Sequence, residues 1–439
     1  MDFLKQKLTV SAATIGLAMS CGVNVSANDV SDIADAVPAQ ETVFSRVLRF
    51  QGDVVAVTAD GKEIRQTAFM RGKRFEYVGE AGARRAAPEQ LSDTRAPDID
   101  TLSVEELAEN LRGTALFRGH QFIEAEPALE LAREAKQLRE LELKGASQEE
   151  LEAVMPGRPA SQGTAERTTN MRQAEMGEDG KGNERIVHGT DERRVMGNTY
   201  YPHRTHIVFD NTGSNWSIGG SQGSGTLIGP STALSVAHVF WDEGANTWES
   251  THRWAPGYDS ADSNRSPYGE WYGCYWVTIP TAYTTYENST YDYAIIDFDV
   301  GCNSVRDGVN SDHPGTTVGW LGNLVASTST IEGRTNYLRG YPGSGTCGNP
   351  GTSCGTRIWG DTSSTSETDA TSNITYHQAD SSGGMSGSGM YIYTDPSCSG
   401  CGYGAYVVGM HRAGAASANS ARRYTSTVRS FMKAYSSDY

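Results

Sequence analysis

Three residues of types that can hydrolyse a peptide bond follow one another along the chain in the order His238, Asp292, Ser386. A serine hydroxyl is a weak nucleophile at neutral pH, so it needs a base to accept its proton and a third group to orient that base. Residues 384–387 read Gly-Met-Ser-Gly, so glycines stand close to the serine on both sides. The residue types and their order predict a Ser-His-Asp triad.

The residues around His238 and Asp292 fit these roles. His238 follows residues 226–237, whose pattern predicts a strand, a turn and a second strand. Asp292 lies between two tyrosines and precedes an apolar run, which suits a buried carboxylate that holds the base. Asp297, inside that run, and Asp299, at its end, are the alternatives for the same role.

The glycines near the serine also suggest how negative charge is stabilised during the reaction. A tight turn would let the backbone N–H groups of Gly384 and Ser386 converge on an oxyanion, and removing one such donor typically costs roughly 10²–10³ in rate. The stretch does not match the Gly-x-Ser-x-Gly turn of α/β-hydrolases, because Ser388 occupies the position of its last glycine. The sequence therefore favours a hydrolase built on a different fold.

Charge and the N-terminus limit where the protein acts. A net charge of −16 over 439 residues argues against nucleic acid or an anionic membrane as a partner. Lys5 and Lys7 precede an apolar stretch, and Val-Ser-Ala at 25–27 offers a cleavage site, so residues 1–27 predict a signal peptide. No later stretch is long and apolar enough to span a membrane. We expect a secreted, extracellular monomer that acts on proteins or peptides without a cofactor, with the periplasm as the alternative location.

Six of the seven cysteines lie in the C-terminal half, and the seventh, Cys21, lies within the predicted signal peptide. An even number of cysteines in an exported protein predicts disulfides. A zinc site is the alternative, but there is only one C-x2-C pair and no second pair complements it, so we expect no metal. The expected pairs join successive cysteines: Cys274 with Cys302, Cys347 with Cys354, and Cys398 with Cys401.

The composition of residues 28–155 differs from that of the chain after residue 185. This first part is rich in Glu, Arg, Ala and Leu, and alternating runs within 43–78 predict a hairpin or small sheet. Ser103-Val-Glu-Glu106 is a capping-box motif, and apolar residues at helical spacing over 127–143 predict a second helix. We expect a small α+β prosegment here, separated from the rest by a polar linker over residues 156–185 that contains the activation site.

Residues 186–439 are rich in Gly, Ser, Thr, Tyr and Trp and contain short β-branched runs. Such runs, with turn signals between them, predict an all-β sandwich or barrel. Examples lie at 206–209, 225–229, 293–298 and 405–410. Residues 424–435 predict one helix near the end of the chain.

Several segments of residues 186–439 match one known family. They are Val187-His-Gly-Thr-Asp-Glu-Arg193, Asn198-Thr-Tyr-Tyr-Pro202, Leu227-Ile-Gly-Pro230, Tyr291-Asp-Tyr-Ala294, Gly340-Tyr-Pro-Gly343, Gly383-Gly-Met-Ser-Gly-Ser388 and Gly409-Met-His411. As a set they resemble the bacterial glutamyl endopeptidases, the V8-like branch of the chymotrypsin-like serine proteases. The resemblance implies a double β-barrel with the active site between the barrels, and it places the triad at His238, Asp292 and Ser386. Three positions depart from the family pattern, namely Val239, Met385 and Gly389.

The resemblance also bears on which peptide bond is cut. In this family a His at the position of His411, with a hydroxyl residue at the position of Ser381, recognises the carboxylate of a substrate Glu. An imidazole in that pocket suits an anionic side chain. Asp380 stands where trypsin-like enzymes carry the carboxylate that binds Arg or Lys, so a trypsin-like preference is the alternative. His411 and Ser381 together favour Glu.

Arg185-Ile186-Val187 looks like the activation site of trypsin-like enzymes. In those enzymes the new amino terminus pairs with an Asp just before the nucleophile, and Met385 stands there instead. We therefore expect activation by removal of the prosegment, after Glu184 or Arg185, with the prosegment acting as an inhibitor or folding aid. An inactive protease-fold binding protein is the alternative of a different class.

Overall fold

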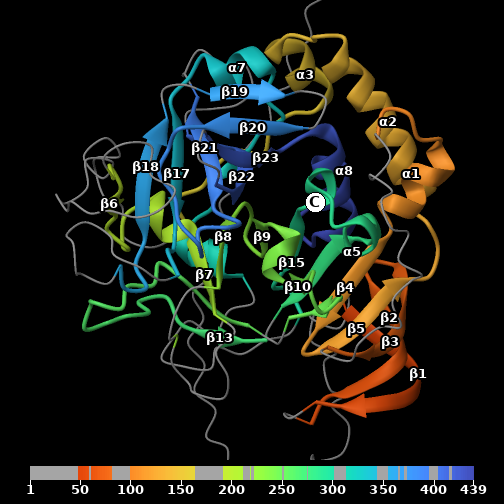
Figure 1. Cartoon of the computed structure of the whole chain (residues 1–439). Coiled ribbons are helices and arrows are strands. Elements are labelled where there is room, and N and C mark those ends of the chain that lie inside the picture. Colours follow the sequence, from red (N-terminus) through yellow and green to blue (C-terminus); the bar gives the residue numbers. More distant parts are fainter. Residues whose placement is uncertain are drawn as a thin grey trace, which may run out of the picture. The chain divides into compact units, whose positions relative to one another are not determined.

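The structure is a computed structural model (Figure 1). It describes residues 48–58, 61–81, 99–163, 191–210, 218, 222–249, 252–273, 275–300, 313–343, 354–363, 366–369, 373–394, 404–414 and 418–439. All of them lie in one compact unit, Val43–Tyr439. The predicted signal peptide lies outside the described residues.

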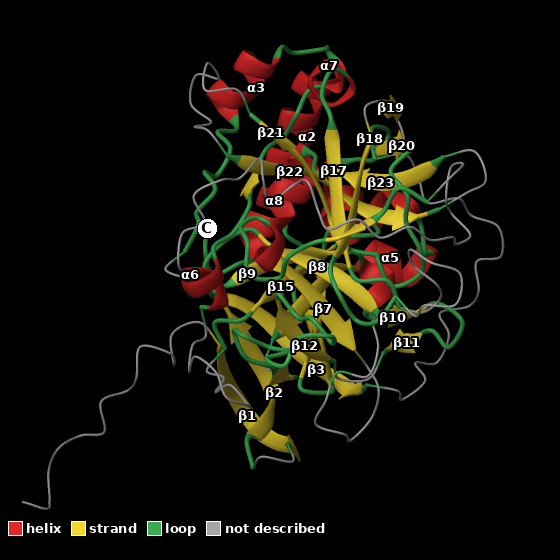
Figure 2. Cartoon of the chain, turned by 90° about the vertical axis from the view of Figure 1, so that its left-hand side faces the viewer, coloured by secondary structure: helices red, strands yellow, loops and turns green. Residues whose placement is uncertain are grey.

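Strands are the commonest regular elements of the described chain, and most of them belong to two large sheets (Figures 1 and 2). The first sheet has twelve strands in the order β1-β2-β3-β5-β4-β14-β15-β9-β8-β7-β12-β13. Seven of them belong to the predicted protease part: β7 (His206–Asp210), β8 (Gly223–Leu227), β9 (Thr232–Ser235), β12 (Arg253–Pro256), β13 (Trp271–Tyr272), β14 (Trp276–Pro280) and β15 (Ala294–Asp297). A separate pair consists of β10 (Trp241–Asp242) and β11 (Thr247–Trp248).

The second sheet has nine strands, and its path runs β19-β20-β23-β22-β21-β17-β18-β6, with β16 paired to β22. Its members are β6 (Arg194–Val195), β16 (Gly322–Asn323), β17 (Asn336–Gly340), β18 (Trp359–Ser363), β19 (Ser366–Asp369), β20 (Ile374–His377), β21 (Gly389–Tyr393), β22 (Ala405–Ala413) and β23 (Asn419–Arg423). Short helices connect the strands: α5 (Thr281–Tyr286), α6 (Pro314–Val318) and α7 (Thr328–Glu332). The prediction that this part is built mainly from β-strands is confirmed, and its strands belong to two large sheets.

The helix predicted near the C-terminus is also confirmed. It is α8 (Ser426–Tyr435), and it begins where the Thr425 side chain accepts a hydrogen bond from the backbone N–H of Val428. Its inner face buries Val428, Phe431 and Met432 in the core. Burial of large apolar side chains of this kind contributes roughly 1.5–3 kcal/mol each, so packing rather than helix propensity holds α8 in place.

The described residues between 48 and 163, called the N-terminal segment below, combine strands and helices. Its strands are β1 (Leu48–Val57), β2 (Glu63–Met70), β3 (Lys73–Glu80), β4 (Gly113–Phe117) and β5 (His120–Glu124), and its helices are α1 (Val104–Asn110), α2 (Leu129–Leu143) and α3 (Gln148–Val154). The capping box predicted at Ser103 and Glu106 is present at the start of α1. A second capping box, Ser147 with Glu150, starts α3.

Residues 158–163, which the composition places in a linker, pack against the protease part. Arg158 and Asn323 exchange backbone hydrogen bonds of 3.1 and 3.2 Å, and Ser161 and Trp320 exchange bonds of 3.0 and 2.8 Å. Among the described residues, no helix has the length and apolar content needed to cross a membrane.

Candidate active site

The sheet brings His238 and Asp292 together. His238 lies in a 3₁₀ turn just after β9, and Asp292 follows another 3₁₀ turn just before β15. Because β9 and β15 are antiparallel neighbours with Ala294 opposite Ser235, the end of one strand meets the start of the other. His238 Nδ1 lies 2.9 Å from Asp292 Oδ2, and the His238 backbone N–H donates to Asp292 Oδ1 at 3.1 Å. One carboxylate therefore holds both the ring and the backbone of the candidate base.

Two glycines shape the turn that carries Ser386. Gly384 has φ 92° and Gly387 has φ 87°, a region that other residues rarely adopt. A Cβ on Gly387 would lie 2.0 Å from the Ser224 carbonyl oxygen, and one on Gly384 would lie 2.3 Å from the Gly343 nitrogen. Only glycine fits at these two positions, so the turn requires the glycines that stand near the serine in the sequence.

The Ser386 hydroxyl is partly exposed and donates to the carbonyl oxygen of Arg412 at 3.3 Å. No hydrogen bond between described residues joins Ser386 to His238, and catalytic hydrogen bonds of this kind are often long or absent before substrate binds. The N–H groups of the neighbouring Met385 and Gly387 donate to Ser382 O and His411 O. The role of the Gly384 and Ser386 N–H groups as oxyanion donors stays a prediction.

The charges around the triad favour an ionised carboxylate and a basic imidazole. Burial opposes the charge on Asp292, but His238 and then Arg412 outweigh it, and the pKa of Asp292 falls below its usual value. Burial also opposes protonation of His238, and Asp292 outweighs it, so the pKa of His238 is raised above 6.5. The imidazolium that the predicted triad requires on His238 would therefore be stabilised.

Arg412 is a contact of the triad that the sequence reasoning missed. Its Nε lies 3.0 Å from Asp292 Oδ2, and its side chain is 29% exposed. The cation lowers the pKa of His238, whereas Glu243 raises it. The only signal in the sequence was its position directly after His411, which says nothing about where a long flexible side chain points.

His411 is buried on β22 and faces a second buried histidine. His411 Nδ1 lies 3.4 Å from His377 Nε2, at the end of β20. Burial, the nearby His377 and then His238 lower the pKa of His411 well below 6.5. The ring is therefore neutral at neutral pH and would act on a carboxylate as a hydrogen-bond donor. His377 was missed because its strand meets that of His411 only through β23.

Ser381 and Asp380, the other predicted specificity residues, differ in how their side chains are used. Ser381 Oγ is buried and has no hydrogen-bond partner among the described residues. Buried hydroxyls are normally satisfied, so this one is suited to a bound ligand. Asp380 is 2% exposed, and its Oδ2 accepts a hydrogen bond of 2.8 Å from the Glu192 N–H.

Residues 380–382 contact residues 191–193, which follow the predicted activation site at residues 184–185. Arg193 is fully buried and donates to Ser382 Oγ at 2.6 Å, while Asp191 neutralises it at 2.7 Å. Asp380 thus helps to fix residues 191–193 beside the nucleophile turn. A carboxylate used in this way is less available to a substrate Arg or Lys.

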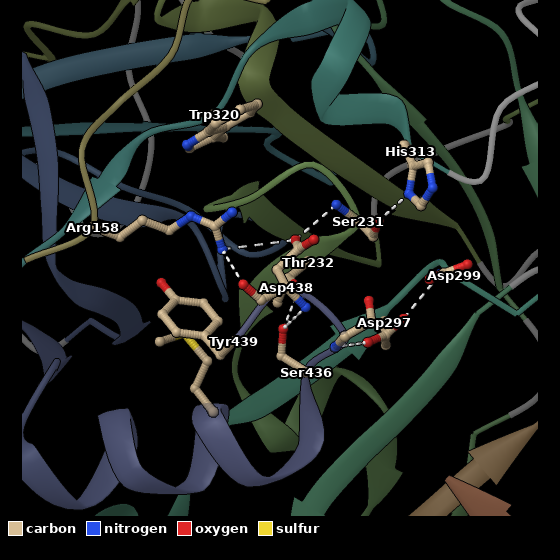
Figure 3. Close-up of polar contacts among 12 residues, drawn as sticks. Arg158, Ser231, Thr232, Asp297, Asp299, His313, Trp320, Ser436, Asp438 and Tyr439 are labelled. Atoms are coloured by element: carbon tan, nitrogen blue, oxygen red, sulfur yellow. Dashed lines mark hydrogen bonds and ion pairs between the residues drawn. The ribbon is translucent and has the colours of Figure 1, made fainter. Parts of the chain in front are cut away.

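The two alternatives to Asp292 lie elsewhere. The Asp297 carboxylate accepts hydrogen bonds from the N–H groups of Asp299 and of Ser437, which lies near the C-terminus (Figure 3). Burial raises the pKa of Asp297 to about 7. No hydrogen bond or ion pair between described residues joins Asp297 or Asp299 to His238.

The predicted disulfide pairing falls almost wholly outside the described residues. Cys354 is disulfide-bonded, and the other five cysteines, Cys274, Cys302, Cys347, Cys398 and Cys401, are not described. Over the described ranges, no cluster of three or more His, Cys, Asp or Glu side chains is arranged to hold a metal ion.

Two known bacterial proteases are similar to this chain in sequence. The chain is 28% identical over 246 residues to the "Extracellular metalloprotease" of Bacillus subtilis, covering 55% of this chain and 66% of the relative. It is 30% identical over 163 residues to the "Glutamyl endopeptidase" of Bacillus licheniformis, covering 37% and 44% respectively. The resemblance to the bacterial glutamyl endopeptidases is confirmed. The matches span just under two thirds of the first relative and under half of the second.

Two solved structures are also similar. A Glu endopeptidase in complex with MPD has a TM-score of 0.40 and 21% identity, covering 57% of this chain and 98% of the other. Protease Anisep from Arthrobacter nicotinovorans has a TM-score of 0.37 and 18% identity, covering 52% and 93%. No family model matches the chain.

Proposed function

We propose that this protein is a secreted serine endopeptidase that cuts after Glu. The observation that carries the proposal is the contact between His238 and the buried Asp292, beside a glycine-shaped turn that presents Ser386. A nucleophile, its base and the group that orients the base are the three parts this chemistry requires. The two curated relatives are both named as proteases, which supports the same reaction class.

The reaction follows from the roles of these residues. Ser386 Oγ forms a bond to the substrate carbonyl carbon while His238 Nε2 accepts the hydroxyl proton. The C–N bond then breaks and His238 returns the proton to the leaving amine, leaving an acyl-enzyme on Ser386. Water, deprotonated by His238, then attacks the ester carbonyl carbon. The bond from that carbon to Ser386 Oγ breaks, His238 returns the proton to Ser386 Oγ, and the acid is released. Asp292 stays ionised throughout and stabilises the imidazolium.

The preference for Glu rests on His411 and Ser381. A neutral imidazole and an unpartnered hydroxyl, both buried, offer hydrogen bonds to a carboxylate without bringing a charge of their own. Asp380 is a weaker candidate for binding a substrate Arg or Lys, because its carboxylate already accepts a hydrogen bond from the backbone of Glu192. The name of the Bacillus licheniformis relative supports the same preference.

Labelling with a fluorophosphonate, followed by cleavage of a peptide library, tests the reaction. We expect covalent labelling of the processed protein at Ser386, cuts after Glu, and loss of both in Ser386→Ala. Absence of labelling and of cutting in the processed protein would favour a protease-fold binding protein. Activity that persists in Ser386→Ala and disappears with a chelator would instead indicate metal-dependent hydrolysis, the chemistry that the name of one relative suggests.

A further inference from the structure

The N-terminal segment and the protease part share one sheet. β4 pairs antiparallel with β14 over five residue pairs, from Gly113 opposite Pro280 to Phe117 opposite Trp276. This pairing joins β1 to β5 to the seven protease strands in the twelve-stranded sheet. Without β4, the β14 edge would expose unpaired N–H and C=O groups, which is unfavourable and promotes aggregation.

The apolar core continues across this junction. The Trp276 ring lies 5.1 Å from the ring of Phe75, 5.3 Å from Phe122 and 6.1 Å from Phe117, measured between centroids. All four side chains are fully buried in the largest apolar cluster. Separating the two parts would expose these rings to water, and aromatic side chains bury about 150–250 Å² each.

Polar contacts between α2 and the C-terminal part add specificity to the junction. Lys433 lies 2.7 Å from Glu134, and the Ser426 N–H donates to Glu142 at 2.8 Å at the start of α8. Arg139, buried in α2, donates to the Asn373 side chain at 2.7 Å. A carboxylate at the N-terminus of α8 also interacts favourably with the helix dipole.

The last residues of the segment hold the C-terminus of the chain. Arg158 donates to the Asp438 carbonyl oxygen at 3.1 Å, and its guanidinium lies 4.8 Å from the Tyr439 ring (Figure 3). Arg71, in the turn after β2, donates to the Lys433 carbonyl oxygen at 3.1 Å. The contacts are therefore spread over much of the segment, from Arg71 to Ser161.

These contacts lie away from the reacting groups. Within the part of the chain that the structure describes, no hydrogen bond or ion pair joins the N-terminal segment to His238, Ser386 or His411. The nearest link is Asn110, which donates at 3.2 Å to the Tyr291 hydroxyl, one residue before Asp292. The segment thus contacts the residue next to Asp292 without contacting the reacting groups themselves.

We propose that the N-terminal segment stays bound after the chain is cut between residues 164 and 190, so that the processed protein is a two-chain complex. The segment is then the noncovalent partner of the β14 and α8 surface, and it does not inhibit by blocking the site. The inference concerns assembly and does not depend on the proposed activity, so each can fail alone.

The test uses the full chain with Ser386→Ala, which prevents self-cleavage. A recognition site for an unrelated specific protease is inserted between residues 164 and 190, the chain is cut with it, and the product is examined by size-exclusion chromatography with native mass spectrometry. We expect both fragments in one 1:1 species that separates only under denaturing conditions. A folded, monodisperse protease part that elutes without the N-terminal fragment would overturn the proposal.

Hydrogen exchange gives a second readout that does not rely on elution. Amides of residues 113–117 and 276–279 should keep their protection after the cut, as should those of β21 and β22, which serve as the control. Loss of protection confined to β4 and β14 would show that the segment has left and would contradict the proposal.

Discussion

The pKa values of two histidines are shifted in opposite directions: that of the partly exposed His238, the candidate base, and that of the buried His411, in the candidate specificity pocket. Asp292 contacts His238 and raises its pKa, whereas burial and His377 lower the pKa of His411. Because the residue type is the same, the surroundings of each ring account for the difference in pKa. Under the proposed function, the His238 ring would take a proton during the reaction, and the neutral His411 ring would donate a hydrogen bond to the substrate.

The largest loss of activity is expected when the His238 ring is removed. His238→Ala should lower kcat/KM by roughly 10⁴-fold or more on every substrate, because the base serves all peptide bonds alike. Steady-state kinetics on peptides with Glu, Gln and Lys before the cut bond measures this. A loss restricted to one substrate would contradict the role of His238.

His411→Ala should act selectively. We expect kcat/KM to fall about 10- to 100-fold on the Glu peptide, since a hydrogen bond to a charged group is worth about 1.5–3 kcal/mol. The matched Gln peptide should be affected much less. An equal loss on both peptides would show that His411 has a structural role only.

The buried His252 shows how burial changes the pKa of a histidine that has no predicted role in the reaction. Burial lowers its pKa to about 4, and its Nδ1 lies 3.1 Å from the Tyr275 hydroxyl. The unfolded chain takes up the proton below pH 6.5 and the folded chain only near pH 4, so stability falls as the pH drops through this range. The loss attributable to His252 at pH 5 is about 2 kcal/mol.

Urea unfolding at pH 7.5 and pH 5 checks this prediction in Ser386→Ala with and without His252→Phe. The double variant should lose less stability between the two pH values than the single variant does. An identical loss in both would mean that His252 is not the group that titrates.

The smallest expected effect concerns Arg412, whose cation lies against Asp292. The acidic limb of kcat/KM should follow His238, with an apparent pKa above 6.5, because activity requires the neutral ring. Arg412→Met should raise that pKa further, since the cation lowers it, and Arg412→Lys should restore it if the lysine keeps the charge in place. An unchanged pH profile in Arg412→Met would show that the ion pair does not tune the base.

The parts that local sequence patterns could predict were those set by neighbouring residues. The capping box at Ser103 and Glu106, the C-terminal helix and the glycines around Ser386 follow from backbone requirements within a few residues. Asp292, preferred over Asp297 for its position at the start of a strand, is the carboxylate that meets His238.

What could not be predicted depends on pairing between distant segments. Nothing in residues 113–117 indicates that they lie against residues 276–280, because any strand with a free edge is a possible partner. Asp380 resembles a free specificity residue until the structure shows the Glu192 N–H bound to it. The contacts of Arg412 and His377 likewise depend on three-dimensional placement alone.

The most direct test of the account is the ratio of kcat/KM for two peptides that differ only in Glu or Lys before the cut bond, measured with processed protein. The account predicts a strong preference for Glu that weakens in His411→Ala and is little changed in Asp380→Asn. A preference for Lys that disappears in Asp380→Asn would contradict it and assign the pocket to a trypsin-like specificity.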